Sequence, residues 1–175
     1  MSTIIEQQQV AVPAGTWQAD PVHSSVGFAV KYLGVATFSG ELKGFEASLV
    51  DGELAGKAPV ASIEVKDENL YAHLQAPEFF DAERFPELTF SGRDAGGRFE
   101  GELTIKGVTK PVTLESVVTG PVTDPYGNER YGLALTAVVD RTDFGLDWNA
   151  PLPGGGFALA NDVTLRAELS LIKAA

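Results

Sequence analysis

The sequence predicts an all-β fold, an antiparallel barrel of about eight strands with a short helical insert around residues 67–84. The first observation behind this prediction is apolar alternation with a period of two, which is typical of strands with one face against a core. The second is the set of glycine and asparagine turn signals between these segments. The third is glycine at inward positions of the strands, namely Gly40, Gly44 and Gly101, which favours a tightly curved sheet.

The alternating segments follow one another from residue 26 to residue 171. Polar or small residues occupy the intervening positions, as in Glu100, Glu102 and Thr104, so one face of each segment is expected to point inward. The inward positions are Val26, Phe28, Val30 and Tyr32; Phe38, Gly40, Leu42 and Gly44; Ala61, Ile63 and Val65; Leu88 and Phe90; Phe99, Gly101, Leu103 and Ile105; Val112, Leu114 and Val118; Tyr131, Leu133, Leu135, Ala137 and Val139; and Val163, Leu165, Ala167, Leu169 and Leu171.

Turn signals such as Asp51-Gly52, Gly96-Gly97 and Lys106-Gly107 predict consecutive hairpins and hence an antiparallel meander. Between Lys66 and Phe85 the alternation stops, and Asp67 is placed to cap a short helix. This insert is expected to cover one end of the sheet. A β-sandwich is the main alternative architecture. A barrel of this size either is filled by side chains or holds one small apolar ligand, as in lipocalin-type barrels.

Composition excludes several classes of function. With 13 basic against 24 acidic residues the net charge is −11, which disfavours nucleic acid as a partner. The chain has no cysteine and no apolar stretch of the length that spans a bilayer. Residues 1–15 are expected to form a disordered leader before a single domain, residues 16–175. The leader lacks the features of a signal peptide, which predicts a cytoplasmic location.

Catalytic and metal motifs are weak in this sequence. His23 and His73 are its only histidines and lie far apart, so no metal site is expected. Asp20, His23 and Ser24 are crowded into five positions, which is typical of a turn before a strand rather than of a triad. The carboxylates between Glu78 and Glu87 are interpreted as a solvated surface, and Gly154-Gly155-Gly156 as a flexible loop.

An ordered series of short motifs is similar to the YceI-like family of polyisoprenoid-binding proteins, from about Thr16 to Lys173. The motifs, in chain order, are Trp17-Gln18-Ala19-Asp20-Pro21-Val22-His23-Ser24, His73-Leu74, Glu78-Phe79-Phe80-Asp81, Phe85-Pro86-Glu87-Leu88-Thr89-Phe90, the run from Gly101 to Val112, and Arg141-Thr142-Asp143-Phe144-Gly145-Leu146. The resemblance implies a lipocalin-like barrel with an elongated apolar tunnel for a long isoprenoid or similar amphiphile. It also implies a homodimer as an expected assembly. This sequence departs from the family at residues 68–72, where the usual stretch with an Arg-Asp pair is replaced, so the tunnel mouth is expected to differ.

On the resemblance and the alternation together, we expect a non-catalytic carrier that holds a polyisoprenoid, an isoprenoid quinone or a fatty-acyl lipid and needs no cofactor. His23 and Arg141 are the candidates for contacts with a polar head group, or for bracing an end of the barrel. The expected ligand-binding residues are Phe28, Tyr32, Phe38, Phe79, Phe80, Phe90, Leu135, Trp148 and Phe157.

Two other functions remain open at this stage. One is an interaction module with a filled barrel, which a cavity of several hundred Å³ would disfavour. The other is an enzyme that acts on an apolar substrate, with His73 and either Glu78 or Asp81 as acid and base.

Overall fold

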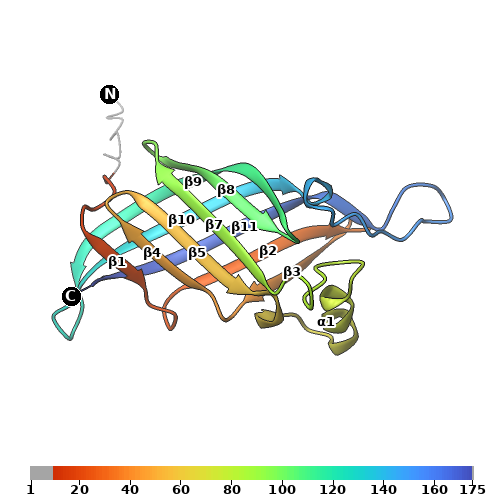
Figure 1. Cartoon of the computed structure of the whole chain (residues 1–175), viewed down its shortest axis with the longest axis horizontal. Helices are drawn as coiled ribbons and strands as arrows, with labels where there is room; N and C mark the ends of the chain where they lie inside the picture. Colours follow the sequence, from red (N-terminus) through yellow and green to blue (C-terminus); the bar gives the residue numbers. More distant parts are fainter. Residues whose placement is uncertain (1–9, 175) are drawn as a thin grey trace, which may run out of the picture.

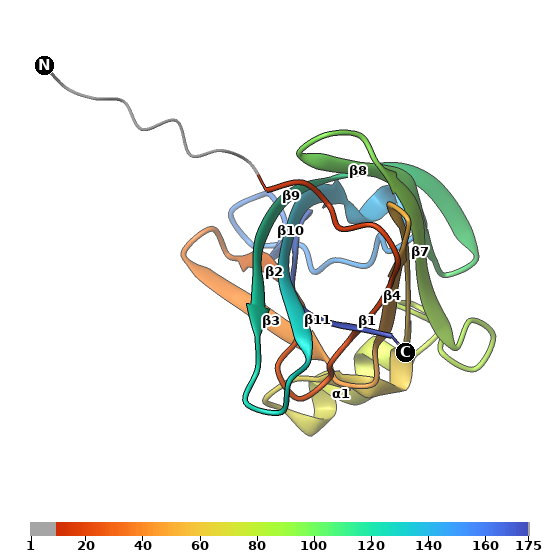
Figure 2. The same cartoon turned by 90° about the vertical axis from the view of Figure 1, so that its left-hand side faces the viewer.

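A computed structural model describes residues 10–174, whose strands form one antiparallel sheet closed into a barrel (Figure 1). The ring of hydrogen-bonded neighbours runs β1, β4, β5, β7, β8, β9, β10, β11, and the pairing of β1 with β11 closes it. The view along the barrel shows these strands surrounding a common axis (Figure 2). The prediction of an eight-stranded antiparallel barrel with a short helical insert is therefore confirmed, and the sandwich is excluded.

The elements have the following bounds. The strands are β1 (Thr16–Ala19), β2 (Ser25–Tyr32), β3 (Ala36–Leu42), β4 (Glu46–Val50), β5 (Glu53–Pro59), β6 (Ile63–Glu64), β7 (Glu87–Asp94), β8 (Arg98–Ile105), β9 (Val108–Thr123), β10 (Glu129–Asp140) and β11 (Leu159–Lys173). One α-helix, α1 (Glu68–Gln75), and two 3₁₀ helices, η1 (Val60–Ser62) and η2 (Arg141–Phe144), connect them.

The long strand β11 organises one side of the wall. It pairs with β1 near its C-terminal end and with β2 over most of the rest of its length. Strand β2 also pairs with β3, and β3 pairs with the two-residue strand β6, which is the edge strand of the sheet. No ladder among the described strands joins β3 or β6 to β5. Helix α1 lies beside this end of the barrel (Figure 1).

The meander is confirmed from β7 to β11 and fails between β3 and β6. Strands β4 and β5 form a hairpin around Asp51-Gly52, a pair of strands that alternation alone did not reveal because inward positions here include Ala47 and Gly56. The strand predicted over residues 61–65 is wrong for the most part. Residues 60–62 form η1, and only Ile63–Glu64 pair with β3.

One end of the barrel is filled by a cluster of buried apolar side chains, here called the plug. Its residues are Trp17, Leu49, Leu54, Phe99, Val118, Leu133, Leu135, Leu169 and Leu171. Trp17 meets Tyr131 edge to face with ring centroids 5.0 Å apart. Because strands from all around the ring contribute to the plug, its packing joins the two halves of the wall.

Helix α1 is attached to the barrel by two side-chain hydrogen bonds. Tyr71 Oη donates to the Ala61 carbonyl at 2.8 Å, and Gln75 Nε2 donates to the Val60 carbonyl at 3.0 Å. The Asp67 carboxylate accepts from the Leu70 N–H and caps the helix, as the sequence predicted. Leu74 is the buried residue of the helix and packs with Val60, Ile63 and Phe79.

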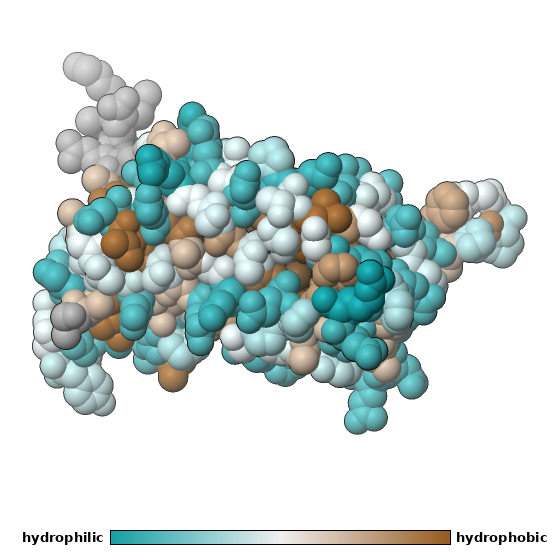
Figure 3. Space-filling model, viewed as in Figure 1, coloured by the Kyte–Doolittle hydropathy of each residue, from teal (hydrophilic) through white to brown (hydrophobic). Residues whose placement is uncertain are grey.

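The predicted leader, residues 1–15, lies only in part within the described chain, because residues 1–9 are outside it. Val12 packs against the plug, and the Gly15 N–H donates to the Asp51 carboxylate at 2.8 Å. Contacts with the barrel thus begin a few residues before Thr16. The face drawn in Figure 3 mixes hydrophilic residues with hydrophobic patches, and the loop between η2 and β11 projects from the end of the barrel opposite the C-terminus (Figure 1).

Candidate functional site

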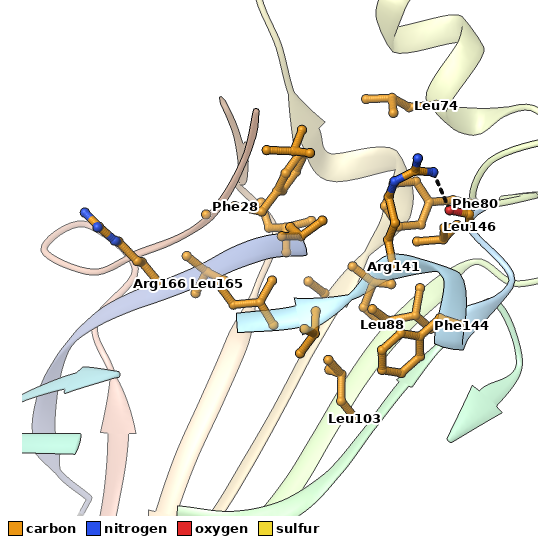
Figure 4. Close-up of a pocket in the computed structure, with 18 of the residues that line it drawn as sticks. Phe28, Leu74, Phe80, Leu88, Leu103, Arg141, Phe144, Leu146, Leu165 and Arg166 are labelled. Atoms are coloured by element: carbon orange, nitrogen blue, oxygen red, sulfur yellow. Dashed lines mark hydrogen bonds between the residues drawn. The ribbon is translucent and has the colours of Figure 1, made fainter. Parts of the chain in front are cut away.

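A cavity of about 710 Å³ occupies the part of the barrel that the plug leaves unfilled. Residues of every strand from β2 to β11 except β6 form its wall, together with α1 and the segment that follows η2. The residues that line the cavity are mostly apolar. Figure 4 labels five of them, namely Phe28, Leu88, Leu103, Phe144 and Leu165. The filled barrel expected of a pure interaction module is therefore not what this chain forms.

The cavity exists because inward glycines and alanines alternate with large side chains. Gly40 lies opposite Phe28, and a methyl group added to Gly40 would come within 2.6 Å of the Phe28 ring. In the same way the Phe90 ring lies over Gly92 and Gly101. Each ring thus takes the space that a side chain at the glycine position would fill.

Most of the predicted ligand-binding residues lie along this cavity. Those that line it are Phe28, Tyr32, Phe38, Phe79, Phe80, Phe90, Leu135 and Trp148. Tyr32 is 45% exposed, and its neighbours Ala36 and Thr37 are exposed as well, so the cavity meets solvent near the β2–β3 turn. These side chains lie in the cavity wall, and their contact with a ligand stays a prediction.

Phe157 does not line the cavity. It belongs to the projecting loop, is 64% exposed and forms an isolated bridge with Pro151. The glycines before it, Gly155 and Gly156, have positive φ and turn the loop away from the barrel. Alternation within the strands gives no information about a side chain in such a loop.

His23 is also outside the cavity. Its Nδ1 lies 2.7 Å from Asp20 Oδ2, and Asp20 accepts in addition from Arg130 Nη1 at 3.0 Å. The Asp20 Oδ1 atom accepts from the Val22 N–H, which is the turn that the sequence predicted. Hydrogen bonds from His23 and Arg130 lower the pKa of Asp20 to about 2. His23 thus lies at the plugged end and does not line the cavity, and its bracing role stays a prediction.

Arg141 does line the cavity and is 5% exposed. Its Nε donates to the Ala160 carbonyl at 2.9 Å, and its Nη1 donates to the carbonyls of Leu146 and Trp148. These bonds tie η2 to the segment after it and to the start of β11, as a bracing role requires. Burial lowers the pKa of Arg141 from its usual value.

A group of rings closes the cavity on the side of α1. The His73 ring stands edge to face against Phe79 and Trp148, with centroids 4.7 and 4.5 Å away. His73 Nε2 lies 3.1 Å from Glu78 Oε1. The sequence singled out His73 as part of the His73-Leu74 motif and as a candidate acid or base, but the alternation could not assign it to the wall because the insert has no strand periodicity.

Asp81, the other candidate acid, is not part of this pair. Its carboxylate is buried and lies 3.6 Å from Arg84 Nη1. Across residues 10–174, no cluster of three or more histidine, aspartate or glutamate side chains is placed to hold a metal ion. None of the helices in this part of the chain has the length and apolar composition needed to cross a bilayer.

Solved structures with the same fold include three with long coverage. The BcnA protein of Burkholderia cenocepacia has a TM-score of 0.73 at 21% identity, over 89% of this chain and 99% of that chain. A domain from Saccharophagus degradans, described as polyisoprenoid binding, has a TM-score of 0.73 at 11% identity, over 90% and 98% of the two chains. The YceI protein of Campylobacter jejuni has a TM-score of 0.69 at 26% identity, over 89% and 96%. The first two likenesses concern the fold alone.

Sequence comparison gives the family. A UPF0312 protein of Vibrio parahaemolyticus is 32% identical over 154 residues, which are 77% of this chain and 82% of that protein. A UPF0312 protein of Staphylococcus aureus is 30% identical over 159 residues, which are 85% and 92% of the two chains. The model of the YceI-like domain matches residues 17–171, which is nearly the whole barrel. The chain therefore belongs to the YceI-like domain family.

Proposed function

We propose that this protein is a non-catalytic carrier that holds a long apolar amphiphile inside its barrel. The observation that carries the proposal is the apolar cavity of about 710 Å³ within a closed wall. Such a cavity is within the range of volumes that bind small apolar ligands. Burial of apolar surface stabilises a complex by roughly 25 cal/mol per Å², so an acyl or isoprenoid chain needs no reaction to remain bound.

The ligand class follows from the shape and chemistry of the wall. The lining offers rings and aliphatic side chains from many strands and few polar groups. A polyisoprenoid, an isoprenoid quinone and a fatty-acyl lipid all match this surface, and the Saccharophagus degradans domain with the same fold is described as polyisoprenoid binding. The homodimer and the cytoplasmic location stay predictions from the sequence.

The first experiment is native mass spectrometry of the freshly purified protein, followed by organic extraction of what it holds. A stoichiometric lipid identifies the ligand class directly. Addition of farnesol to the delipidated protein provides the matched binding assay, with farnesol as a defined isoprenoid probe. A wild-type protein that takes up neither a host lipid nor farnesol contradicts the carrier function.

A pair of tryptophan substitutions on β10 tests where the ligand lies. Leu135 points into the cavity, whereas Val138 on the same strand is 64% exposed. Leu135→Trp fills space that the ligand needs, so farnesol affinity is expected to fall about tenfold or more, and Val138→Trp is expected to leave it unchanged. Circular dichroism verifies that both variants fold. Equal farnesol binding by the two folded variants places the ligand outside the cavity.

A further inference from the structure

Arg141 holds a buried nitrogen without a hydrogen-bond partner. Among the side chains of residues 10–174, its Nη2 is the buried polar atom for which no partner is found. The other guanidinium nitrogens are satisfied, because Nε and Nη1 donate to the three backbone carbonyls of Ala160, Leu146 and Trp148. A buried donor that stays unpaired is unfavourable, so this nitrogen calls for an acceptor.

The charge of this guanidinium is compensated only at a distance, by the carboxylates of Asp140 and Asp147. No carboxylate in the described part of the chain comes within ion-pair distance of Arg141. The neighbouring Asp140 carboxylate accepts at Oδ1 from the Thr142 N–H at 2.9 Å and from the Thr142 hydroxyl at 2.6 Å. Asp147 is exposed. The guanidinium keeps its charge at neutral pH, and it therefore lies in an apolar wall without a carboxylate in direct contact.

The position of Arg141 makes the cavity the source of the missing acceptor. Arg141, Leu74 and Phe80 line the same cavity, and Figure 4 shows the guanidinium on the α1 side of it, whereas Arg166 points away from the other labelled residues. Nη2 is covered in this arrangement. Phe80 belongs to the turn after α1, is half-buried and lines the same cavity as Arg141.

We propose that Arg141 binds the carboxylate of a long-chain fatty acid whose alkyl chain occupies the cavity. The inference rests on the proposed carrier function and names its ligand. A monoanion neutralises the guanidinium, which a neutral alcohol, phenol or quinone does not. The single free NH₂ group matches one carboxylate, and it offers too few donors for a phosphate or diphosphate. Phe28 and Leu165, on the opposite side of the cavity in Figure 4, then contact the chain.

The first test compares head groups on the wild-type protein. Palmitic acid, hexadecanol and methyl palmitate share one chain and differ in charge. Because a charged hydrogen bond replaces an unpaired donor, palmitic acid is expected to bind about tenfold or more tightly than hexadecanol, measured by displacement of a bound fluorescent probe. Equal affinities for the three compounds overturn the proposal, and the carrier function stands. Failure of all three and of farnesol rejects the carrier function itself.

The second test supplies a carboxylate from the protein. Leu74 and Arg141 line the same cavity, so Leu74→Glu adds an acidic side chain of similar size to the wall that holds the guanidinium, and Leu74→Gln is the uncharged control. Leu74→Glu is expected to lose the preference for palmitic acid over hexadecanol, because the guanidinium is already neutralised, and Leu74→Gln is expected to retain most of it. A folded Leu74→Glu variant that keeps the full preference overturns the proposal. If Leu74→Glu does not fold, the head-group comparison on the wild-type protein decides.

Discussion

Arg130 connects three segments at the plugged end of the barrel. Its Nη1 donates to Asp20 Oδ2 at 3.0 Å and to Ser170 Oγ at 3.1 Å, and its Nε donates to Asp124 Oδ2 at 2.7 Å. The three side chains of this ion-pair network are mostly shielded from solvent. Arg130 holds the pKa of Asp124 well below its usual range, and the two carboxylates raise the pKa of Arg130.

Arg130→Gln is expected to lower stability at neutral pH and to weaken the dependence of stability on acid. The folded protein keeps Asp20 ionised down to a pKa of about 2, whereas the unfolded chain protonates it near 3.8. Unfolding therefore takes up protons in this window, so the contribution is complete above the unfolded value and is lost as the pH falls through the folded one. Urea unfolding between about pH 7 and pH 2 measures the effect.

The matched control is Arg93→Gln. Arg93 Nη2 lies 2.6 Å from Glu53 Oε1, but both side chains are well exposed, at 77% and 62%. Exposed ion pairs contribute little because water screens them, so this variant is expected to follow the wild-type curve. If Arg93→Gln and Arg130→Gln give the same acid dependence, the network at the plugged end has no special part in stability.

At the scale of the strands, the Phe90 ring packs so closely against the backbone of β7 and β8 that positions 92 and 101 have no space for a side chain larger than that of glycine. Gly101 on β8 pairs with Gly92 on β7, and the Phe90 ring covers both. A methyl group on Gly101 would come within 2.8 Å of the Phe90 ring and would also meet the backbone of Ser91 and Gly92. Glycine is needed here for lack of space and not for a left-handed conformation.

Gly101→Ala is expected to destabilise the protein by about 1–3 kcal/mol, because the backbone of β7 has to shift away. Gly154→Ala serves as the control, since nothing lies within 4 Å of the added carbon in the projecting loop. It is expected to change stability by less than about 0.5 kcal/mol. Thermal and urea unfolding of both variants measure the difference. A Gly101→Ala protein as stable as Gly154→Ala contradicts the close packing of β7 and β8.

At the scale of the whole molecule, the side chains that fill the barrel interior and those that line the cavity lie mostly in different parts of the barrel. The plug fills one part of the interior, and the cavity occupies the other. Most plug residues, such as Trp17 and Phe99, do not line the cavity, whereas Leu54, Leu135 and Leu169 belong to both. Substitutions in the two regions are therefore expected to have different consequences.

Phe99→Ala is expected to lower the free energy of unfolding by about 3–5 kcal/mol, because its side chain is fully buried in the plug. Farnesol affinity at a temperature where the variant is folded is expected to stay near the wild-type value. Val138→Ala, on the outer face of β10, is the control for stability. A Phe99→Ala variant that loses binding while it remains fully folded shows that the plug forms part of the binding site.

Several features of this protein are determined by its sequence alone. The period-two alternation of β7 to β11 determines which side chains face inward, because a strand turns successive residues to opposite faces. The cap of α1 by Asp67 is equally local, because donor and acceptor lie three residues apart. Membership of the YceI-like family also follows from the order of the motifs between Trp17 and Leu146, and the family model matches the same part of the chain.

Only the tertiary structure decided where the interior is filled and where it is hollow. Leu135 and Leu133 have the same parity on β10, yet only Leu135 lines the cavity, because distance along the barrel axis and not parity separates plug from cavity. Residues outside the strands depend on the packing of distant segments in the same way. His73 lines the cavity because α1 packs against the barrel, whereas Phe157 lies in an exposed loop outside the cavity. The carbonyls near Arg141 pair with two of its nitrogens, and Nη2 has no partner.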